Sequence, residues 1–445
     1  AVLLIHGMGE QRPMETLWGF VQAVWLSDRN MVGTRRGQVY SKPDTITENL
    51  ELRRITTQPW AGKDRRRVDF FEFYWAHLMT GNTIQHVLVW LGALLIRRPS
   101  SVPARLFPVW LVSCVLVASM LLFAALAALP DTLRPAWIPA GWWPIFLVIA
   151  GVLSLMQAAW IAPVAGDAAR YLSASPDNVA ARSTIREAGL KVLSQLHASK
   201  RYDRIIIVGH SLGTVIGYDI LNFYWSRMNA DELAAHHPRG SATMTTLEAL
   251  EEAAGRLVTD KTAAARDAYR EAQRRYFADL SRAGPDKAGS WLVSDFVTLG
   301  SPLSKADVLL ARDKPALEKK KTLREVPSCP PWLEKLKPPR MSYPFRQEAR
   351  TPHHACAFAP TVWTNVYFRS AFILFGDIIG GEVSPLLGPG IEDIRLRIGG
   401  PVFRHLDYWK DPAAEPPNEW IVALRRAVNL RQATTPEGTV EQRVE

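Results

Sequence analysis

Residues 204–221 read RIIIVGHSLGTVIGYDIL. The run 205–208 has no polar position, which is typical of a strand buried on both faces of a parallel sheet. It is followed by Gly209, Ser211 and Gly213 in a G-x-S-x-G pattern, and then directly by an amphipathic helix. In such an elbow the serine takes a strained backbone conformation, and the glycines let strand and helix come close together. The stretch predicts an α/β fold in which a turn at the end of a central strand lifts a reactive serine hydroxyl out of the sheet.

The rest of the chain alternates between strand-like and helix-like patterns. Apolar, β-rich runs predict strands at 2–5, 68–75, 291–299 and 362–368, and apolar spacing of three to four residues predicts helices at 14–27, 179–198 and 417–430. Strands that alternate with helices favour a mostly parallel sheet flanked by helices. We therefore expect an α/β fold across most of the sequence.

Two long apolar runs interrupt this alternation. Residues 107–129 and 142–166 carry no charge, and each is long enough as a helix to cross a hydrocarbon core of about 30 Å. The run 83–96 is too short to span, and it fits either an interfacial position or packing against the hairpin. The runs predict a transmembrane hairpin, and a buried soluble hairpin is the alternative. Four arginines flank the outer ends of the transmembrane hairpin. By the positive-inside rule, we expect these ends and the rest of the protein on the cytoplasmic side. The arginines are Arg97, Arg98, Arg105 and Arg170.

The predicted organisation has six parts. They are a first α/β portion (1–80), a membrane-associated insertion (81–170), an α/β portion with the elbow (171–228), a charged helical insertion and possible lid (229–289), a last α/β portion (290–430), and a polar tail (431–445).

Composition narrows the class of partner. The net charge is +10, but the basic runs are short and scattered, which indicates solvated loops and not a nucleic-acid surface. Three widely spaced cysteines cannot form a disulfide framework and fit a reducing compartment. His353, His354 and Cys356 lack a second ligand pair, so we expect no metal site.

The elbow and the segment VLLIHGMGEQ at residues 2–11 together resemble the α/β-hydrolase superfamily, in particular bacterial lipase- and esterase-like members. The resemblance covers most of 1–80 and 171–430. It implies an oxyanion hole formed by the backbone N–H groups of Met8 and Leu212, and a triad in the chain order serine, acid, histidine. We expect His6 itself to be a buried structural imidazole, and His210 belongs to the elbow.

The resemblance also selects the partners of Ser211. Asp377 stands in WTNVYFRSAFILFGDIIGG, similar to a late strand followed by an acid and a Gly-rich loop, and we prefer it to Asp295, Asp307 and Asp393. His405, in FRHLDYWKDP, is the histidine that follows Asp377, whereas His353 and His354 precede it. We therefore expect a Ser211–His405–Asp377 triad.

These features together predict a membrane-bound serine hydrolase that cleaves carboxylic esters of lipids or phospholipids through an acyl-enzyme, without a cofactor. The expected location is a bacterial inner membrane, with the catalytic part in the cytoplasm. Three alternatives stay open. They are a thioesterase or depalmitoylase, a secreted antibacterial lipase effector, and a membrane scaffold without catalysis.

Overall fold

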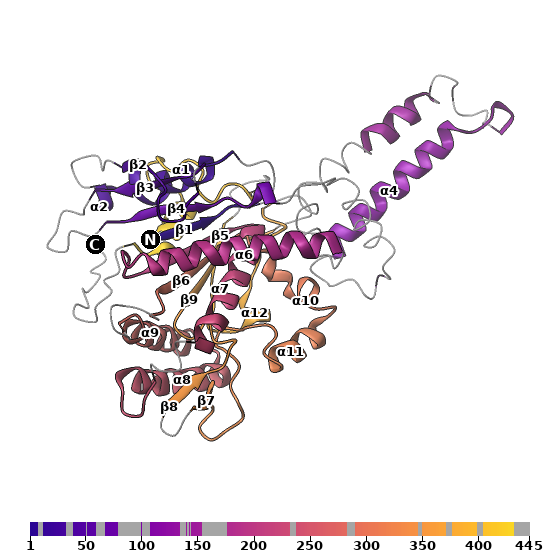
Figure 1. Cartoon of the computed structure of the whole chain (residues 1–445). Coiled ribbons are helices and arrows are strands. Elements are labelled where there is room, and N and C mark those ends of the chain that lie inside the picture. Colours follow the sequence, from indigo (N-terminus) through magenta and orange to yellow (C-terminus); the bar gives the residue numbers. More distant parts are fainter. Residues whose placement is uncertain are drawn as a thin grey trace. The chain divides into compact units, whose positions relative to one another are not determined.

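A mostly parallel sheet of eight strands forms the centre of the fold, in the order β10-β9-β6-β5-β1-β4-β3-β2 (Figure 1). Strands β10 through β4 run parallel, while β3 is antiparallel to both β4 and β2. The strands are β1 (Val2–Ile5), β2 (Val39–Pro43), β3 (Arg53–Thr57), β4 (Asp69–Phe73), β5 (Ile205–His210), β6 (Val293–Leu299), β9 (Val362–Phe368) and β10 (Glu392–Leu396). The α/β architecture predicted from the sequence is therefore present.

This computed structural model describes residues 1–7, 12–32, 39–49, 51–58, 67–78, 99, 107–133, 139, 142, 144–153, 176–231, 237–282, 290–345, 349–370, 376–397 and 404–430. Contacts divide the chain into two units. The first comprises residues 1–78 and 182–445 and contains the sheet, and the second comprises residues 79–181. The predicted interfacial run 83–96 and the tail 431–445 lie outside the described residues.

Helices cover both faces of the sheet, because its central strands are apolar on both sides. On one face α1 (Glu15–Val21), the π-helical η1 (Gln22–Leu26) and α13 (Glu419–Val428) join Leu4, Val208 and Val366 in one buried cluster. On the other face lie α6 (Pro176–Ala198) and α7 (Leu212–Asp231), where a Cβ on Gly189 would lie 2.2 Å from Ile220 Cδ1. Close contact of these two helices therefore depends on Gly189.

The charged insertion forms two amphipathic helices, α8 (Ala242–Asp260) and α9 (Ala263–Leu280), which pack against each other (Figure 1). Ser241 and Thr262 cap their N-termini, accepting bonds from Met244 N and Ala265 N at 3.2 Å. The remaining elements are short. They are α2 (Arg29–Val32), η2 (Ala76–Leu78), η4 (Asp131–Leu133), η7 (Pro302–Lys305), α10 (Ala306–Leu309), α11 (Lys314–Thr322), β7 (Ser342–Phe345), β8 (Ala349–Pro352) and α12 (Ser384–Leu387).

The helix pair α8–α9 is anchored near the amino end of β9. Tyr269 OH and Gln273 Nε2 both donate to the carbonyl of Phe358, at 3.0 and 2.7 Å, and Arg270 Nη1 donates to that of Trp363 at 2.8 Å. In a parallel sheet, the side chains of a catalytic site gather at the carboxyl ends of the strands. This anchoring therefore gives no support to a lid role for the insertion.

The second unit contains helix α4 (Phe107–Ala127) and a helical segment at 144–153, which contact each other through Phe123 and Phe146, with ring centroids 5.7 Å apart. Both carry large apolar side chains that are more than 40% exposed, among them Leu121, Leu122 and Leu147. Within the described ranges, no helix combines the length and apolarity needed to cross a membrane. The predicted transmembrane hairpin is thus not supported, and its second run is described only as far as residue 153.

Candidate active site

Ser211 occupies the sharp turn between β5 and α7. Its φ is 52°, in the left-handed region, and its N–H donates to the carbonyl of Leu299 on β6 at 2.9 Å. A Cβ on Gly209 would lie 2.7 Å from Gly213 O, and one on Gly213 would lie 2.3 Å from Ile5 O. Neither position has room for a side chain, so the two glycines are what bring strand, turn and helix together.

The first oxyanion donor proposed from the sequence, Met8, lies outside the described residues. The preceding His6 and Gly7 are described, and a Cβ on Gly7 would lie 3.0 Å from Ser211 Cβ. The His–Gly turn therefore adjoins the serine. Leu212, the second proposed donor, is the first residue of α7, where N–H groups have no acceptor within the helix.

His6 has a structural role, as its sequence context suggested. Its Nδ1 donates to Gly7 O at 2.8 Å, and its Nε2 accepts from Trp75 N–H at 3.2 Å. Burial lowers the pKa of His6 to about 4, so the ring is neutral at pH 7. These bonds hold the backbone of the His–Gly turn next to Ser211.

The structure brings Asp377 and His405 together. Asp377 Oδ1 lies 3.0 Å from His405 Nδ1 and also accepts the backbone N–H groups of Ile379 and Gly380 at 2.8 Å. The Asp377 carboxyl group is fully buried, which by itself would raise its pKa, but His405 and these bonds hold the pKa of Asp377 well below its usual range. A charged carboxylate therefore faces Nδ1 of the imidazole.

Tyr408 provides a further bond that the sequence did not reveal. Its hydroxyl donates to Asp377 Oδ2 at 2.6 Å, and burial followed by the Asp377 charge raises the pKa of Tyr408 well above its usual value. Tyr408 follows His405 by three residues, so one short segment supplies both of these side-chain partners of the carboxylate. Its position in the predicted loop was visible in the sequence, but its contact with a residue 31 positions away was not.

His210 links the elbow to the loop that carries His405. Its Nε2 lies 2.8 Å from the carbonyl oxygen of His405, and the two rings are 4.9 Å apart. Burial lowers the pKa of His210 to about 3, so the ring is neutral and Nε2–H is the donor. Because His210 directly precedes Ser211, this bond fixes the distance between the serine turn and the imidazole loop.

The other candidate acids, Asp295, Asp307 and Asp393, lie away from His405 in the fold's supporting elements. Asp295, at the start of β6, pairs with Arg204 at 3.0 Å and with Arg274 at 3.7 Å. Asp393 accepts from Asn365 Nδ2 at 2.7 Å and from two backbone N–H groups. Asp307 lies in the short helix α10.

The histidines before Asp377 do not enter the site. His353 is buried, with Nε2 3.0 Å from Trp332 O, and burial lowers its pKa to about 4. His354 follows it on the surface, and the Cys356 thiol is buried. Within the described ranges, no group of three or more potential metal ligands occurs.

The nucleophile and the base are both enclosed. Ser211 is 2% exposed and His405 is 5% exposed, and Ser211 Oγ has no hydrogen-bond partner among the described residues. A buried hydroxyl without a partner costs free energy, which is tolerated at sites that act on a ligand.

Comparison of the chain with protein-family models, curated proteins and solved structures found no match. Any function of these residues therefore has to be inferred from their own geometry.

Proposed function

We propose that this protein is a serine hydrolase that cleaves carboxylic esters through an acyl-enzyme, as in the α/β-hydrolase superfamily. The observation that carries the proposal is the buried pair Asp377–His405, joined through His210 to a serine held at φ 52°. A serine in such a turn, an imidazole nearby and a carboxylate behind the imidazole are the three parts that acyl transfer requires.

In the proposed reaction, Ser211 Oγ attacks the ester carbonyl while His405 Nε2 takes the hydroxyl proton. Asp377 keeps the remaining proton on Nδ1 and stabilises the imidazolium that forms. Backbone N–H groups of Leu212 and Met8 bind the oxyanion, and His405 then protonates the leaving alcohol. Water, deprotonated by His405, releases the acid product and restores the serine. The reaction needs no cofactor.

We propose lipid esters, including phospholipids, as the substrate class. The support is the second unit, whose helical segments expose large apolar side chains such as Leu122, Leu147 and Val148 at 58–64%. Exposed apolar surface of this kind is typical of contact with a partner or a membrane. The proposed location is a bacterial inner membrane, with the catalytic unit on the cytoplasmic side where the flanking arginines would also lie.

The direct test combines labelling with substrate analysis. A fluorophosphonate probe should label the wild type and fail to label Ser211→Ala, while Ser183→Ala, which changes an exposed serine on α6, should label normally. Lipid extracts incubated with wild type and Ser211→Ala should differ in free fatty acids.

The outcomes separate the proposal from its competitors. A folded wild type that stays unlabelled would contradict the enzyme assignment and favour a scaffold. Cleavage of thioesters without oxygen esters would leave Ser211 as nucleophile but replace the substrate class with acyl thioesters.

A further inference from the structure

A cavity of about 670 Å³ lies where the strands of the sheet begin, at the end opposite the one that carries the serine turn. Thr364 lines it near the amino end of β9, and Glu392 lines it as the first residue of β10. Ser211 and Asp377, in contrast, follow the carboxyl ends of β5 and β9. The cavity is therefore separate from the candidate active site.

Charged side chains line this cavity with an excess of positive charge. The described lining contains four arginines, Arg270, Arg274, Arg425 and Arg426, and two carboxylates, those of Asp28 and Glu392. The lining therefore carries a net charge of +2. Burial lowers the pKa of Arg270, and the nearby charge of Arg274 lowers it further, against the opposing effect of Glu392. The effect of Arg274 on Arg270 places two positive charges close together, and an added anion would be stabilised near them.

Two of the arginines are held by the fold. Arg270 donates to Trp363 O and Thr364 Oγ1 at 2.8 and 2.9 Å and pairs with Glu392 at 3.0 Å. Arg425 donates to Ala23 O at 2.9 Å from the last turn of α13. These contacts fix the walls of the cavity, so it is formed before any ligand arrives.

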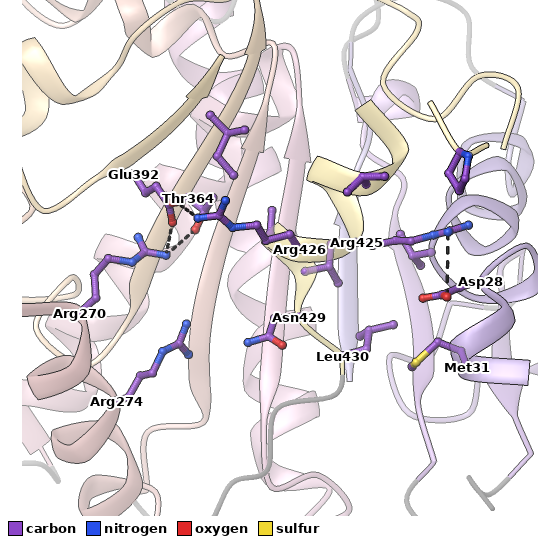
Figure 2. A pocket seen from close by; sticks show the side chains of 16 residues that line it. Asp28, Met31, Arg270, Arg274, Thr364, Glu392, Arg425, Arg426, Asn429 and Leu430 are labelled. Carbon is purple, nitrogen blue, oxygen red and sulfur yellow. Dashed lines mark hydrogen bonds and ion pairs between the residues drawn. The ribbon is translucent and has the colours of Figure 1, made fainter. Parts of the chain in front are cut away.

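The other two arginines reach the cavity from different helices. Arg274 comes from α9, is 27% exposed and pairs with Asp295 at 3.7 Å, whereas Arg426 comes from α13, is 69% exposed and pairs with Glu392 at 2.5 Å. A bound anion would therefore share each guanidinium group with a carboxylate. Figure 2 shows Arg426 and Arg270 meeting at Glu392, with Arg274 and the amide of Asn429 further along the same pocket. Guanidinium groups that converge from two elements suit an anion with several oxygens.

We propose that this cavity binds a small phosphate-bearing molecule, with its phosphate between Arg274 and Arg426 and its body against the apolar wall. A phosphate dianion matches the charge of +2, and its oxygens match the planar donors of arginine. The wall includes Val24, Met31 and Ile394, which can cover a carbon skeleton. The volume of about 670 Å³ suits a small ligand and not a nucleic-acid strand.

Titration calorimetry with inorganic phosphate and with glycerol 3-phosphate tests the proposal. The wild type should bind at least one of them, and Arg426→Gln should weaken binding about tenfold, the effect of one charge-assisted hydrogen bond. Arg274→Gln should act similarly, and the double variant should lose about a hundredfold. Because Arg426 is mostly exposed, its variant should fold even if Arg274→Gln disturbs the pair with Asp295.

Arg275→Gln is the matched control, because Arg275 neighbours Arg274 on α9 but pairs with Glu271 on the surface and does not line the cavity. Its affinity should equal that of the wild type, and Ser211→Ala should also bind normally, so the two proposals fail independently. Binding of phosphatidic acid vesicles that depends on Arg426, without binding of the soluble esters, would identify a lipid headgroup as the source. The proposal is overturned if the wild type binds none of these probes, or if Arg275→Gln weakens binding as much as Arg426→Gln does.

Discussion

Replacing Gly300 with alanine should disable the candidate triad without touching any of its members. Gly300 follows β6 with φ 58°, and a Cβ there would lie 2.7 Å from Asp377 Oδ2, 2.9 Å from Tyr408 Cε2 and 3.0 Å from His405 Nδ1. All three partners are buried, so the added methyl group must displace the carboxylate, the imidazole or both. The left-handed backbone adds a cost of about 1–2 kcal/mol for any residue other than glycine.

The expected size follows from the displacement. Relief of contacts near 2.7–3.0 Å requires shifts of several tenths of an ångström, and a misplacement of about 1 Å costs roughly a hundredfold in rate. We therefore expect Gly300→Ala to lower kcat/KM for a p-nitrophenyl ester by about tenfold to a hundredfold. Urea unfolding should show a loss of about 2–5 kcal/mol in the free energy of unfolding, the backbone cost of about 1–2 kcal/mol plus about 1–3 kcal/mol for overpacking.

Gly240→Ala is the matched control, because Gly240 also has a positive φ, 77°, but a Cβ there meets no atom within 4 Å. It should lose about 1 kcal/mol of stability from the backbone alone and keep full activity. If Gly300→Ala were as active as the wild type, or Gly240→Ala equally impaired, the packing of the triad around Gly300 would not matter for function.

Three further substitutions test single bonds and charges. In Asp377→Asn the amide oxygen can still accept from the two backbone N–H groups and His405, and the amide nitrogen can donate to Tyr408, so mainly the negative charge is lost. At about 4 Å and an effective dielectric constant near 20, loss of this charge costs about 4 kcal/mol, or roughly a thousandfold in kcat. A loss below tenfold in stopped-flow ester cleavage would speak against a catalytic carboxylate. Tyr408→Phe removes a 2.6 Å hydrogen bond to that carboxylate and should lower the free energy of unfolding by about 1.5–3 kcal/mol at pH 7. An unchanged urea midpoint would show that the bond does not stabilise the fold. Burial raises the pKa of Glu72 from 4.5 to about 7, so its protonated form is favoured in the folded state and stability falls as pH rises from about 4.5 to 7. In Glu72→Gln the side-chain oxygen can still accept from Met14 N–H. The variant should have the same free energy of unfolding as the wild type at pH 4 and a higher one, by up to about 3 kcal/mol, at pH 8. The same pH dependence in variant and wild type would refute this.

The sheet was predictable where strands are apolar on both faces. The predicted strands 2–5 and 362–368 coincide with β1 and β9, and 68–75 contains β4. The edge strands were missed because their exposed positions carry polar and charged residues, as in EDIRL of β10 and VYSKP of β2. Such sequences do not differ locally from loops, and only pairing with a neighbour makes them strands.

The candidate site was predictable in so far as it follows a local pattern. The turn at Ser211 is encoded by its glycines, while Asp377 and His405 came from the resemblance and its chain order. The contacts of Tyr408 and His210 depend on how two loops meet, and no spacing in the sequence reports that. The same holds for α8–α9, whose charged helices were predicted but whose anchoring near the amino end of β9 was not.

The position of β1 in the sheet has a consequence for synthesis of the chain. β1 is fully buried and pairs on one side with β4 and on the other with β5, which follow it by about 70 and 200 residues. About 130 residues separate β4 from β5, and a ribosome needs roughly 7–26 s to translate them. During this time the nascent chain can form the pair β1–β4, but one apolar edge of β1 stays open to other chains. A chaperone that covers this edge until residue 210 has emerged should raise the yield of folded protein.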